Sequence, residues 1–315
     1  MRRATVGGLC FCVALAASTS AANSFWDEGK STAPLAISVL GYGLENVTEN
    51  TVDAFEKGIA LGATGVEMSA RLTADGKVAL LHDFLTPDEE LVSAKNFSDL
   101  PAGTLELATA IEAVGAHGHG MNIVMRNDRL EAGYDSTNRI AAVVVARIRS
   151  AGVAHLVLLS AFEFDTVVAA KAACDGCGIR TAWLLDSLQA PLFSSTRYLE
   201  KTAAAGLDAL SPEAGMVDRE MLEGAHHRGL RLFAWFHGEP LETESPALMQ
   251  TLSDCGVGGF ITHQVPWAID SRVRKQPTSG AACERKRSCA MRRWNKQWQV
   301  DEVRVDCDWA DSRAV

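Results

Sequence analysis

Residues 62–83, GATGVEMSARLTADGKVALLHD, contain the pattern that decides the fold. Gly62 stands where a helix would end in a left-handed residue, and the run from Gly65 to Ser69 then predicts a short buried strand. Asp75-Gly76 is a turn signal, after which Val78–Leu81 would return as a second strand. The stretch therefore indicates the end of a helix, a strand and a hairpin, in that order.

The same unit of helical segment, glycine and short strand recurs along the chain. The glycines are Gly62, Gly152, Gly178, Gly206, Gly229 and Gly256. The predicted strands are Ala36–Leu40, Gly65–Ser69, Asn122–Met125, His155–Leu159, Thr181–Leu185, Leu207–Leu210, Arg231–Trp235 and Gly259–Thr262. Several of them are nearly continuous apolar runs, which are typical of parallel strands with helices on one face and barrel core on the other.

Apolar residues recur at helical spacing in the segments between these strands. Two examples are Val52, Phe55 and Ile59, and Ile140, Val144 and Ile148. Eight such units predict an α/β protein with a TIM (β/α)8 barrel, which we place at residues 33–271. A doubly wound open sheet is the alternative fold. It requires a glycine-rich phosphate loop after the first strand, and residues 41–46, GYGLEN, do not supply one.

The overall composition is that of a folded globular protein with an acidic balance. Of 315 residues, 47% are hydrophobic and 22% are charged, and 30 Lys and Arg against 39 Asp and Glu give a formal charge of -9. This balance disfavours nucleic-acid binding, because a phosphate backbone attracts basic surfaces. A small phosphate ester stays possible, since a local pocket can differ in charge from the average.

The first 22 residues have the order of a secretory signal. Arg2 and Arg3 precede an apolar run, Val6–Ala17, and small residues follow up to Ala22. The run is too short to span a bilayer comfortably, so a cleaved signal is favoured over an uncleaved anchor. No later stretch is long and apolar enough for an integral membrane segment. We therefore expect a secreted, extracellular protein.

Six cysteines would remain after cleavage of the signal. They are Cys174, Cys177, Cys255, Cys283, Cys289 and Cys307. An even number in an oxidising compartment predicts disulfides. Cys174 and Cys177 form a CxxC, for which a buried or locally paired thiol is favoured over redox chemistry or zinc. Residues 272–315, which hold three of these cysteines, predict a disulfide-tied C-terminal extension, and the sequons at Asn46 and Asn96 are possible glycosylation sites.

Polar residues stand where the predicted strands end, which is the end of a TIM barrel at which active sites form. They include Glu67, Ser69, Arg126, Asp128, Ser160, Ser211, Glu213, His237 and His263. Alternation along the strand puts Glu67 and Ser69 on one face, pointing into the barrel mouth. The hairpin that follows would deliver His82 to the rim.

An ordered set of motifs resembles the glycerophosphodiester phosphodiesterase family. It comprises Glu49-Asn50-Thr51, Ala54-Phe55, Gly62-Ala63, Gly65-Val66-Glu67, Arg71-Leu72-Thr73, Asp75-Gly76, His82-Asp83, Ser160-Ala161-Phe162 and Gly256-Val257 through Ile261-Thr262 with Pro266. The resemblance covers about residues 36–267 and implies a TIM barrel that hydrolyses glycerophosphodiesters to glycerol 3-phosphate and an alcohol. It also implies two catalytic histidines and a divalent cation, Mg²⁺ or Ca²⁺, held by carboxylates.

By this resemblance, three residues match the family's catalytic and metal-binding positions. Glu49 and Glu67 match two metal-binding acids, and His82 matches one catalytic histidine. Arg126 takes a lysine position, and with His82 it could hold the anion of a substrate.

Other family positions are replaced. Gly41 stands at the first histidine, and Tyr42 replaces its arginine and could wall the pocket. Ser69 and Val124 replace two further metal carboxylates. The resemblance therefore implies a metal site that is incomplete or empty.

Three hypotheses follow for the function. The first is a family member that binds a small phosphodiester or phosphate ester but is catalytically impaired, a pseudoenzyme. The second is an active phosphodiesterase, or a phospholipase D-like enzyme, in which Asp128 or His263 takes over a lost role. The third is a secreted scaffold or interaction protein whose function lies in residues 272–315.

Overall fold

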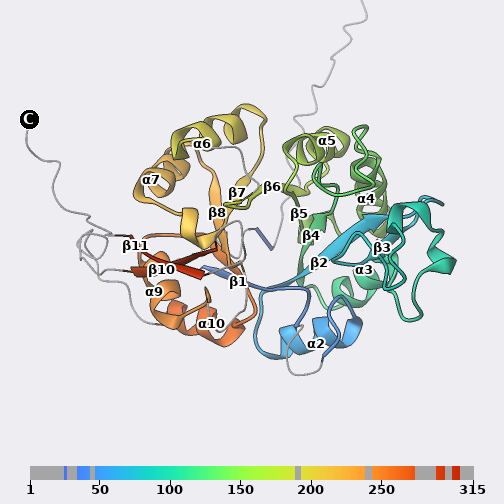
Figure 1. Ribbon diagram of the computed structural model, residues 1–315, viewed down its shortest axis with the longest axis horizontal. Coiled ribbons are helices and arrows are strands. Elements are labelled where there is room, and N and C mark those ends of the chain that lie inside the picture. Colours follow the sequence, from blue (N-terminus) through green and yellow to red (C-terminus); the bar gives the residue numbers. More distant parts are fainter. Residues whose placement is uncertain are drawn as a thin grey trace, which may run out of the picture.

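A closed barrel of eight parallel strands lies at the centre of the molecule, with helices around it (Figure 1). The computed structural model describes residues 25–26, 34–42, 47–188, 193–237, 243–273, 289–294 and 300–305. The barrel strands are β1 (Leu35–Ser38), β2 (Gly65–Leu72), β4 (Gly120–Met125), β5 (Val157–Ala161), β6 (Arg180–Leu185), β7 (Ala209–Pro212), β8 (Arg231–Trp235) and β9 (Gly259–Thr262). Strand β1 pairs with both β2 and β9, which closes the barrel and confirms the predicted TIM fold.

Each barrel strand divides its side chains between two cores, because successive residues point to opposite faces. On β4, Met121 and Ile123 pack outward in the core shared with the helices, whereas Val124 packs inside the barrel. The inner core also contains Leu158 of β5 and Ile261 of β9. Both faces of these strands are therefore buried, which accounts for their nearly continuous apolar sequence.

The helices that follow the strands in the described part of the chain cover the outside of the barrel. They are α2 (Val52–Ala60), α3 (Leu107–Gly115), α4 (Arg139–Ala151), α5 (Phe164–Cys174), α6 (Ser195–Ala204), α7 (Arg219–His227), α9 (Pro246–Asp254) and α10 (Val265–Val273). Thr51 caps α2 by accepting a hydrogen bond from the amide of Ala54, which is the preferred role of threonine there. All six glycines that the sequence pattern placed at turns have a positive φ, between 67° and 94°.

A hairpin extends β2 beyond the barrel, as the turn signal predicts. Strand β3 (Val78–Leu80) pairs antiparallel with β2 in a register that places Ala70 opposite Leu80. Between this hairpin and α3 lie two short 3-10 helices, η1 (Val92–Ala94) and η2 (Phe97–Asp99). The hairpin and its connection bring residues 82–84 back toward the barrel mouth.

Three of the predicted strands include residues that the structure places outside the strand. His155 lies in a 3-10 turn, η3 (Ala154–Leu156), so β5 begins two residues later than expected. Strand β1 ends at Ser38, because Leu40 has a φ of 50° and belongs to a turn. Strand β7 begins at Ala209 rather than Leu207. At Leu40 a turn, and at Leu156 a 3-10 helix, contains an apolar residue that hydrophobicity alone assigns to a strand.

Two aromatic residues near the chain's beginning close the bottom of the barrel. Phe25 and Trp26 are 2% and 7% exposed and belong to the inner core. A Cβ on Gly120, at the start of β4, would come within 2.0 Å of the Phe25 ring, which shows how closely this ring is packed. The Trp26 ring lies 4.8 Å from the guanidinium of Arg231 at the start of β8. The pair therefore acts as a floor to the barrel.

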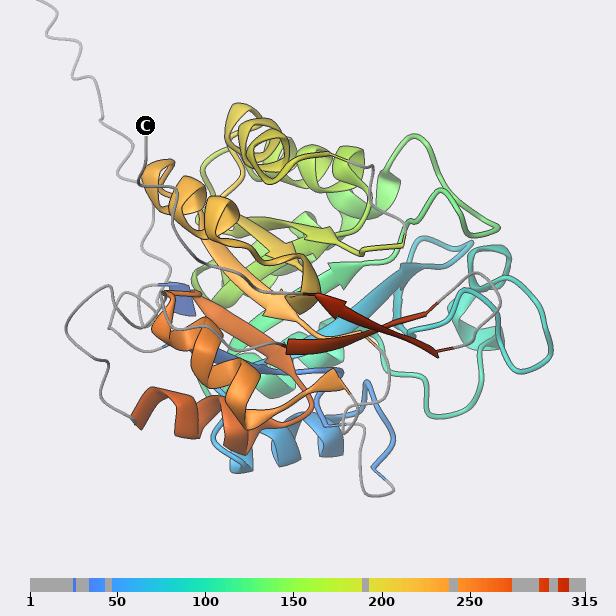
Figure 2. The ribbon, with the colours of Figure 1, turned by 60° about the vertical axis from the view of Figure 1, so that its left-hand side comes forward.

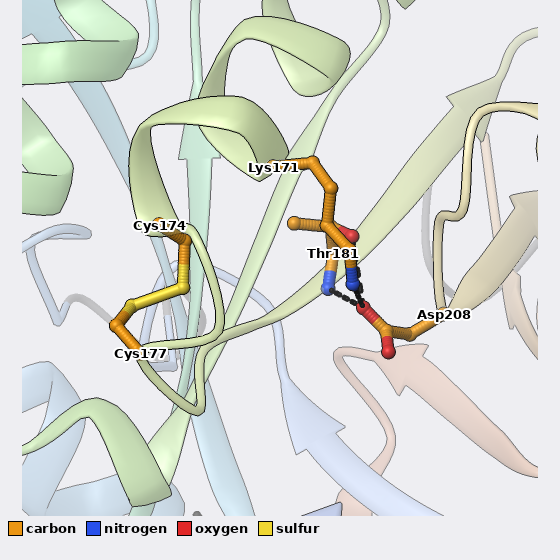
Figure 3. Close-up of a disulfide and its surroundings, with 5 residues drawn as sticks. All are labelled: Lys171, Cys174, Cys177, Thr181 and Asp208. Atoms are coloured by element: carbon orange, nitrogen blue, oxygen red, sulfur yellow. Dashed lines mark hydrogen bonds and ion pairs between the residues drawn. A yellow bond between two sulfur atoms is a disulfide. The ribbon is translucent and has the colours of Figure 1, made fainter. Parts of the chain in front are cut away.

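A disulfide joins Cys174 and Cys177 where α5 ends, so the predicted local pairing of this CxxC is confirmed (Figure 3). The two residues between them, Asp175 and Gly176, both have a positive φ. Beside it, Lys171 of α5 and Thr181 of β6 both donate hydrogen bonds to Asp208. The Cys174–Cys177 bridge therefore closes the turn between α5 and β6.

Only part of the predicted C-terminal extension lies among the described residues. Within it, β10 (Cys289–Trp294) and β11 (Val300–Val305) form a two-stranded antiparallel sheet, seen in dark red in Figure 2. The predicted signal, residues 1–22, lies outside the described residues. Among the described helices, none combines the length and apolar character needed to cross a membrane.

Candidate functional site

A buried polar chain crosses three neighbouring strands inside the barrel. Asn122 of β4 donates a hydrogen bond from Nδ2 to Oε2 of Glu67 on β2, over 3.0 Å. The Asn122 Oδ1 atom accepts a bond of 2.8 Å from Oγ of Ser160 on β5. Glu67 is 9% exposed and the other two side chains are fully buried. This chain fixes the Glu67 carboxyl group in the barrel interior.

Burial dominates the electrostatics of the two carboxyl groups in the mouth. It raises the pKa of Glu67 to about 7, although the charges of His263 and Arg126 and the bond from Asn122 act in the opposite direction. Burial also raises the pKa of Glu49, which lies near enough to His82 and His263 for their charges to lower it partly. The two carboxyl groups and two histidines thus face one region.

A buried carboxylate orients His263, which follows β9. Glu244 is 3% exposed, and its Oε1 accepts hydrogen bonds from the backbone amide of His263 and lies 3.1 Å from Nδ1 of its ring. Its Oε2 accepts bonds from the hydroxyl of Thr262 and the amide of Gln264. The contact at Nδ1 fixes the orientation of the His263 ring, and Nε2 is then the ring nitrogen that can contact another group.

His82 stands at the rim, where Arg71 holds its backbone. The ring Nδ1 lies 2.9 Å from Asp83, and the side chain is 46% exposed. The guanidinium of Arg71 donates two hydrogen bonds to the carbonyl of His82, at 3.0 and 2.6 Å. It also makes a bidentate pair with Glu131, at 2.7 and 3.0 Å. A nearly buried arginine therefore fixes the backbone at this histidine.

Arg126 is a partnered cation beside the mouth. Its Nη2 donates to Glu131 over 3.2 Å and lies 3.5 Å from Asp128. Burial raises the pKa of Glu131, but the bonds from Arg71 and the charge of Arg126 outweigh this and lower it overall. An anionic ligand would therefore share Arg126 with two carboxylates.

The positions at which the sequence leads us to expect a departure from the family pattern lie in apolar or confined surroundings. A Cβ on Gly41, whose φ is 87°, would stand 2.7 Å from the backbone carbon of Ala54. Val124 is 3% exposed and packs in the inner core. Ser69 is 2% exposed, and its amide donates to the Oδ1 atom of Asn50. None of the three supplies a charged group.

The donor set does not fit a tightly held divalent cation. Hard cations such as Mg²⁺ and Ca²⁺ need about six oxygen ligands, several of them charged. Glu49 and Glu67 are the carboxylates that the resemblance matches to metal ligands, and with a pKa of about 7 Glu67 is only half ionised at neutral pH. Within the described residues, no group of three or more His, Cys, Asp or Glu side chains could hold a metal ion.

Most of the residues that the sequence selected are brought together, but not all. Tyr42 is 8% exposed, with the ammonium of Lys57 5.8 Å from its ring centre. Asp128 lies 3.5 Å from Arg126, and the strongest charges acting on it are those of Arg126 and Glu131. Asn96 is exposed at the start of η2, and Asn46 lies outside the described residues.

Two residues of the site were missed in the sequence. Asn122 was assigned only to a strand, although a lone amide in an apolar run signals a buried polar contact. Glu244 stands 19 residues before His263 and has no local pattern that links the two. Sequence spacing could have indicated the first residue but not the second.

The fold and the mouth together define a class of protein: a TIM barrel with two carboxyl groups and two histidines at the ends of its strands. The chain matches the Glycerophosphoryl diester phosphodiesterase family over residues 41–266. Since this is well over half of the chain, the protein belongs to that family.

Two relatives align with most of this chain. A glycerophosphodiester phosphodiesterase of Caldanaerobacter subterraneus is 23% identical over 257 residues, which are 73% of this chain and 94% of that protein. The uncharacterized protein YqiK of Bacillus subtilis is 26% identical, over 68% of this chain and 88% of that protein.

Among solved structures, a putative glycerophosphoryl diester phosphodiesterase of Silicibacter pomeroyi has a TM-score of 0.64 and 17% identity, over 79% of this chain and 97% of that chain. An Oleispira antarctica phosphodiesterase in complex with the product sn-glycerol-3-phosphate has a TM-score of 0.63 and 19% identity, over 78% of this chain and 99% of that chain. These similarities support the fold.

Proposed function

We propose that this protein binds glycerol phosphate esters in the barrel mouth and hydrolyses them weakly or not at all. Family membership supports the ligand class, and the phosphodiesterase of similar fold with bound sn-glycerol-3-phosphate points to the same chemistry. Within the mouth, Arg126 and His82 supply the groups that an anion would contact. We attribute the impairment to Gly41, Ser69 and Val124, which stand where the family has a histidine and two carboxylates.

The observation that carries this proposal is the backbone at Gly41, the position matched to the family's first histidine. Its φ of 87° is strained for any side-chain-bearing residue, and a Cβ would lie 2.7 Å from the backbone of Ala54 and 2.7 Å from the Phe55 ring. Helix α2 would have to shift before a histidine could stand there. Since one positioned acid or base contributes about 10²- to 10⁴-fold in rate, its loss alone is severe.

The two replaced carboxylates give a second reason to expect impaired catalysis. Ser69 and Val124 cannot supply the charge that two further carboxylates would bring to a cation, so Glu49 and Glu67 are left as its charged ligands. With a pKa of about 7, Glu67 is also half protonated at neutral pH. A cation in this mouth would therefore be bound weakly. The residues of the mouth would then bind the ester without cleaving it efficiently.

Calorimetric titration of the full chain with sn-glycerol 3-phosphate tests the proposal. We expect saturable binding in the micromolar to millimolar range that His82→Ala and Arg126→Gln each weaken. Steady release of glycerol 3-phosphate from glycerophosphodiesters should stay at or near background in parallel assays with Mg²⁺ or Ca²⁺ present. No heat at millimolar ligand, or turnover comparable to that of an active family enzyme, would contradict this assignment.

One observation favours a second function, slow hydrolysis by a rearranged pair of histidines. His263 is oriented by the buried Glu244, and its charge reaches both Glu67 and Glu49. Because the charge of His82 also acts on Glu49, the mouth holds two imidazoles, one of which could accept a proton while the other donates one.

This second function predicts measurable product release that His263→Ala and His82→Ala both abolish. Glu244→Gln should lower the rate without removing it, because the amide still positions the ring but no longer stabilises its charged form. His155→Ala, a histidine in η3 at the start of β5, serves as the control. A rate that survives both histidine substitutions would exclude the pair.

We also propose that the chain is exported. The signal-like residues 1–22 support this, and the Cys174–Cys177 disulfide agrees with an oxidising compartment. Amino-terminal sequencing of protein recovered from the medium should give Asn23 as the first residue. Recovery of full-length chain from the cell interior, with Met1 retained, would contradict export.

A further inference from the structure

A polar cavity lies between the residue 82–84 segment and the loop after β4, beside the mouth. The volume within it that a water-sized molecule can reach is about 50 Å³, and it opens to solvent. Arg71, Phe84 and Ser93 line one side, and Asp128 and Tyr134 line the other. Ala132 and Gly133, which are exposed, form part of its rim. The cavity is therefore open to a ligand from outside.

Two walls of this cavity are shared with the mouth. Arg126 lines the cavity, and its charge also acts on Glu67 in the barrel interior. Arg71 lines the cavity as well, and it bonds to the carbonyl of His82. A diester whose phosphate lies between Arg126 and His82 would thus have one of its ester substituents directed toward the cavity.

Most of the charged groups in the cavity wall are already paired. Arg71 is held by Glu131, and Asp135 accepts hydrogen bonds from Thr137 and Arg139 on both of its oxygens. The guanidinium of Arg126 donates to Glu131. The Nε atom of Arg126 is buried without a hydrogen-bond partner among the described residues, so Arg126 can still donate to the phosphate of an ester. The carboxylates of Glu131 and Asp135 need nothing further from a ligand.

Asp128 is the exception. It is 5% exposed, and one carboxyl oxygen lies 3.5 Å from Nη2 of Arg126. The other oxygen, Oδ1, is buried and has no hydrogen-bond partner among the described residues. A buried acceptor that lacks a hydrogen-bond donor destabilises the protein. A ligand that enters the cavity and donates a hydrogen bond to Oδ1 would remove this cost.

We propose that this cavity is a subsite for the head group of the ester, and that it selects head groups that donate a hydrogen bond to Asp128. An ethanolamine ammonium has three N–H donors, whereas the trimethylammonium of choline has none and is bulkier. This inference rests on the proposed function, because it needs the phosphate to lie in the mouth.

The nearby charges agree with this choice. Burial raises the pKa of Asp128 to about 6, with Arg126 and Arg71 acting to lower it and Glu131 and Glu163 to raise it. At pH 8 the carboxyl group is therefore ionised and accepts hydrogen bonds on both oxygens. The Phe84 and Tyr134 side chains line the same space and can cover the methylene groups of the head group.

The test is a comparison of two ligands on the full chain at pH 8. Calorimetric titrations with glycerophosphoethanolamine and glycerophosphocholine give a ratio of dissociation constants, and glycerol 3-phosphate is titrated beside them. A hydrogen bond to a charged group corresponds to a factor of about 10 or more, so glycerophosphoethanolamine should bind about tenfold or more tightly than glycerophosphocholine.

Asp128→Ala should bring this ratio close to one, because it removes the acceptor. Asp128→Asn keeps the shape of the side chain and should retain the fold, and the loss of charge should still lower the ratio to below about threefold. Asp135→Asn is the matched control: this acid lines the same cavity, but its oxygens are already bonded, so the ratio should stay at the wild-type value.

The outcomes separate the two proposals. If glycerol 3-phosphate binds and the wild-type ratio is near one, the cavity is filled by water only and this inference is wrong. A tenfold ratio that survives Asp128→Asn and Asp128→Ala would also overturn it. Failure of glycerol 3-phosphate itself to bind would overturn the proposed function, and the subsite with it.

Discussion

Replacement of Glu67 by glutamine should stabilise the protein above neutral pH. The glutamine keeps an oxygen that can accept the bond from Asn122, but it removes a carboxyl group whose ionised form is buried and disfavoured. In the unfolded chain this group has its ordinary pKa of 4.5, whereas in the folded protein its pKa is about 7. The wild-type protein therefore bears a cost that the variant lacks.

The sign follows from the protons bound in each state. Below pH 4.5 both states hold the proton, so Glu67 has no effect on stability. Between pH 4.5 and 7 the unfolded state releases it first, and stability falls as pH rises; above pH 7 the full cost is present. At 1.36 kcal/mol for each unit, the difference between pH 5 and pH 8 is on the order of 2 to 3 kcal/mol.

Urea unfolding of both proteins at pH 5 and pH 8, with chelator present, measures this difference. The free energy of unfolding of wild type, relative to that of Glu67→Gln, should fall by about 2 to 3 kcal/mol between pH 5 and pH 8. Glu112→Gln, on the exposed face of α3, is the control and should show no such change. If Glu67→Gln and wild type differ by the same amount at both pH values, the carboxyl group is not buried as we describe.

Three further substitutions test the scaffold by denaturant unfolding. Phe25→Ala should cost about 3 to 5 kcal/mol, because it empties the floor of the barrel, and a loss below 1 kcal/mol would show that this ring is not packed there. Gly41→Ala should lower the free energy of unfolding by about 2 to 4 kcal/mol, because residue 41 has a positive φ and a Cβ there would overlap with α2. An unchanged denaturation midpoint would show that Gly41 is not confined, and would remove the main argument for impaired catalysis. Glu131→Gln should cost about 2 kcal/mol by leaving two nearly buried arginines short of a partner, whereas Glu223→Gln, from an exposed ion pair, should change little.

The barrel could be predicted because the sequence signals for its strands and turns each lie within a short stretch of the chain. Each strand is a buried run, and each of the six glycines marks a turn whose positive φ other residues avoid, so both signals can be read within about ten residues. The predicted boundaries were wrong where a turn or 3-10 helix contains apolar residues, as at Leu40 and Leu156, because hydrophobicity alone does not distinguish such a residue from the end of a strand.

The site could be predicted only in part. Glu67 and His82 were found because they belong to motifs in which neighbouring residues also match. Glu244 was missed because its contact with His263 depends on how two segments meet in space. Phe25 and Trp26 were missed for a similar reason, since their partners lie as far along the chain as Arg231.

The pairing of β1 with β9 sets the order in which this molecule can assemble. Residues 35–38 are synthesised early, yet their second ladder partner, residues 259–262, comes more than 200 positions later. Until those residues leave the ribosome, the edges of β1 and β8 stay open, and open edges invite pairing between chains. A chain arrested before residue 259 should therefore aggregate, whereas one that reaches residue 273 contains every strand that the cylinder needs.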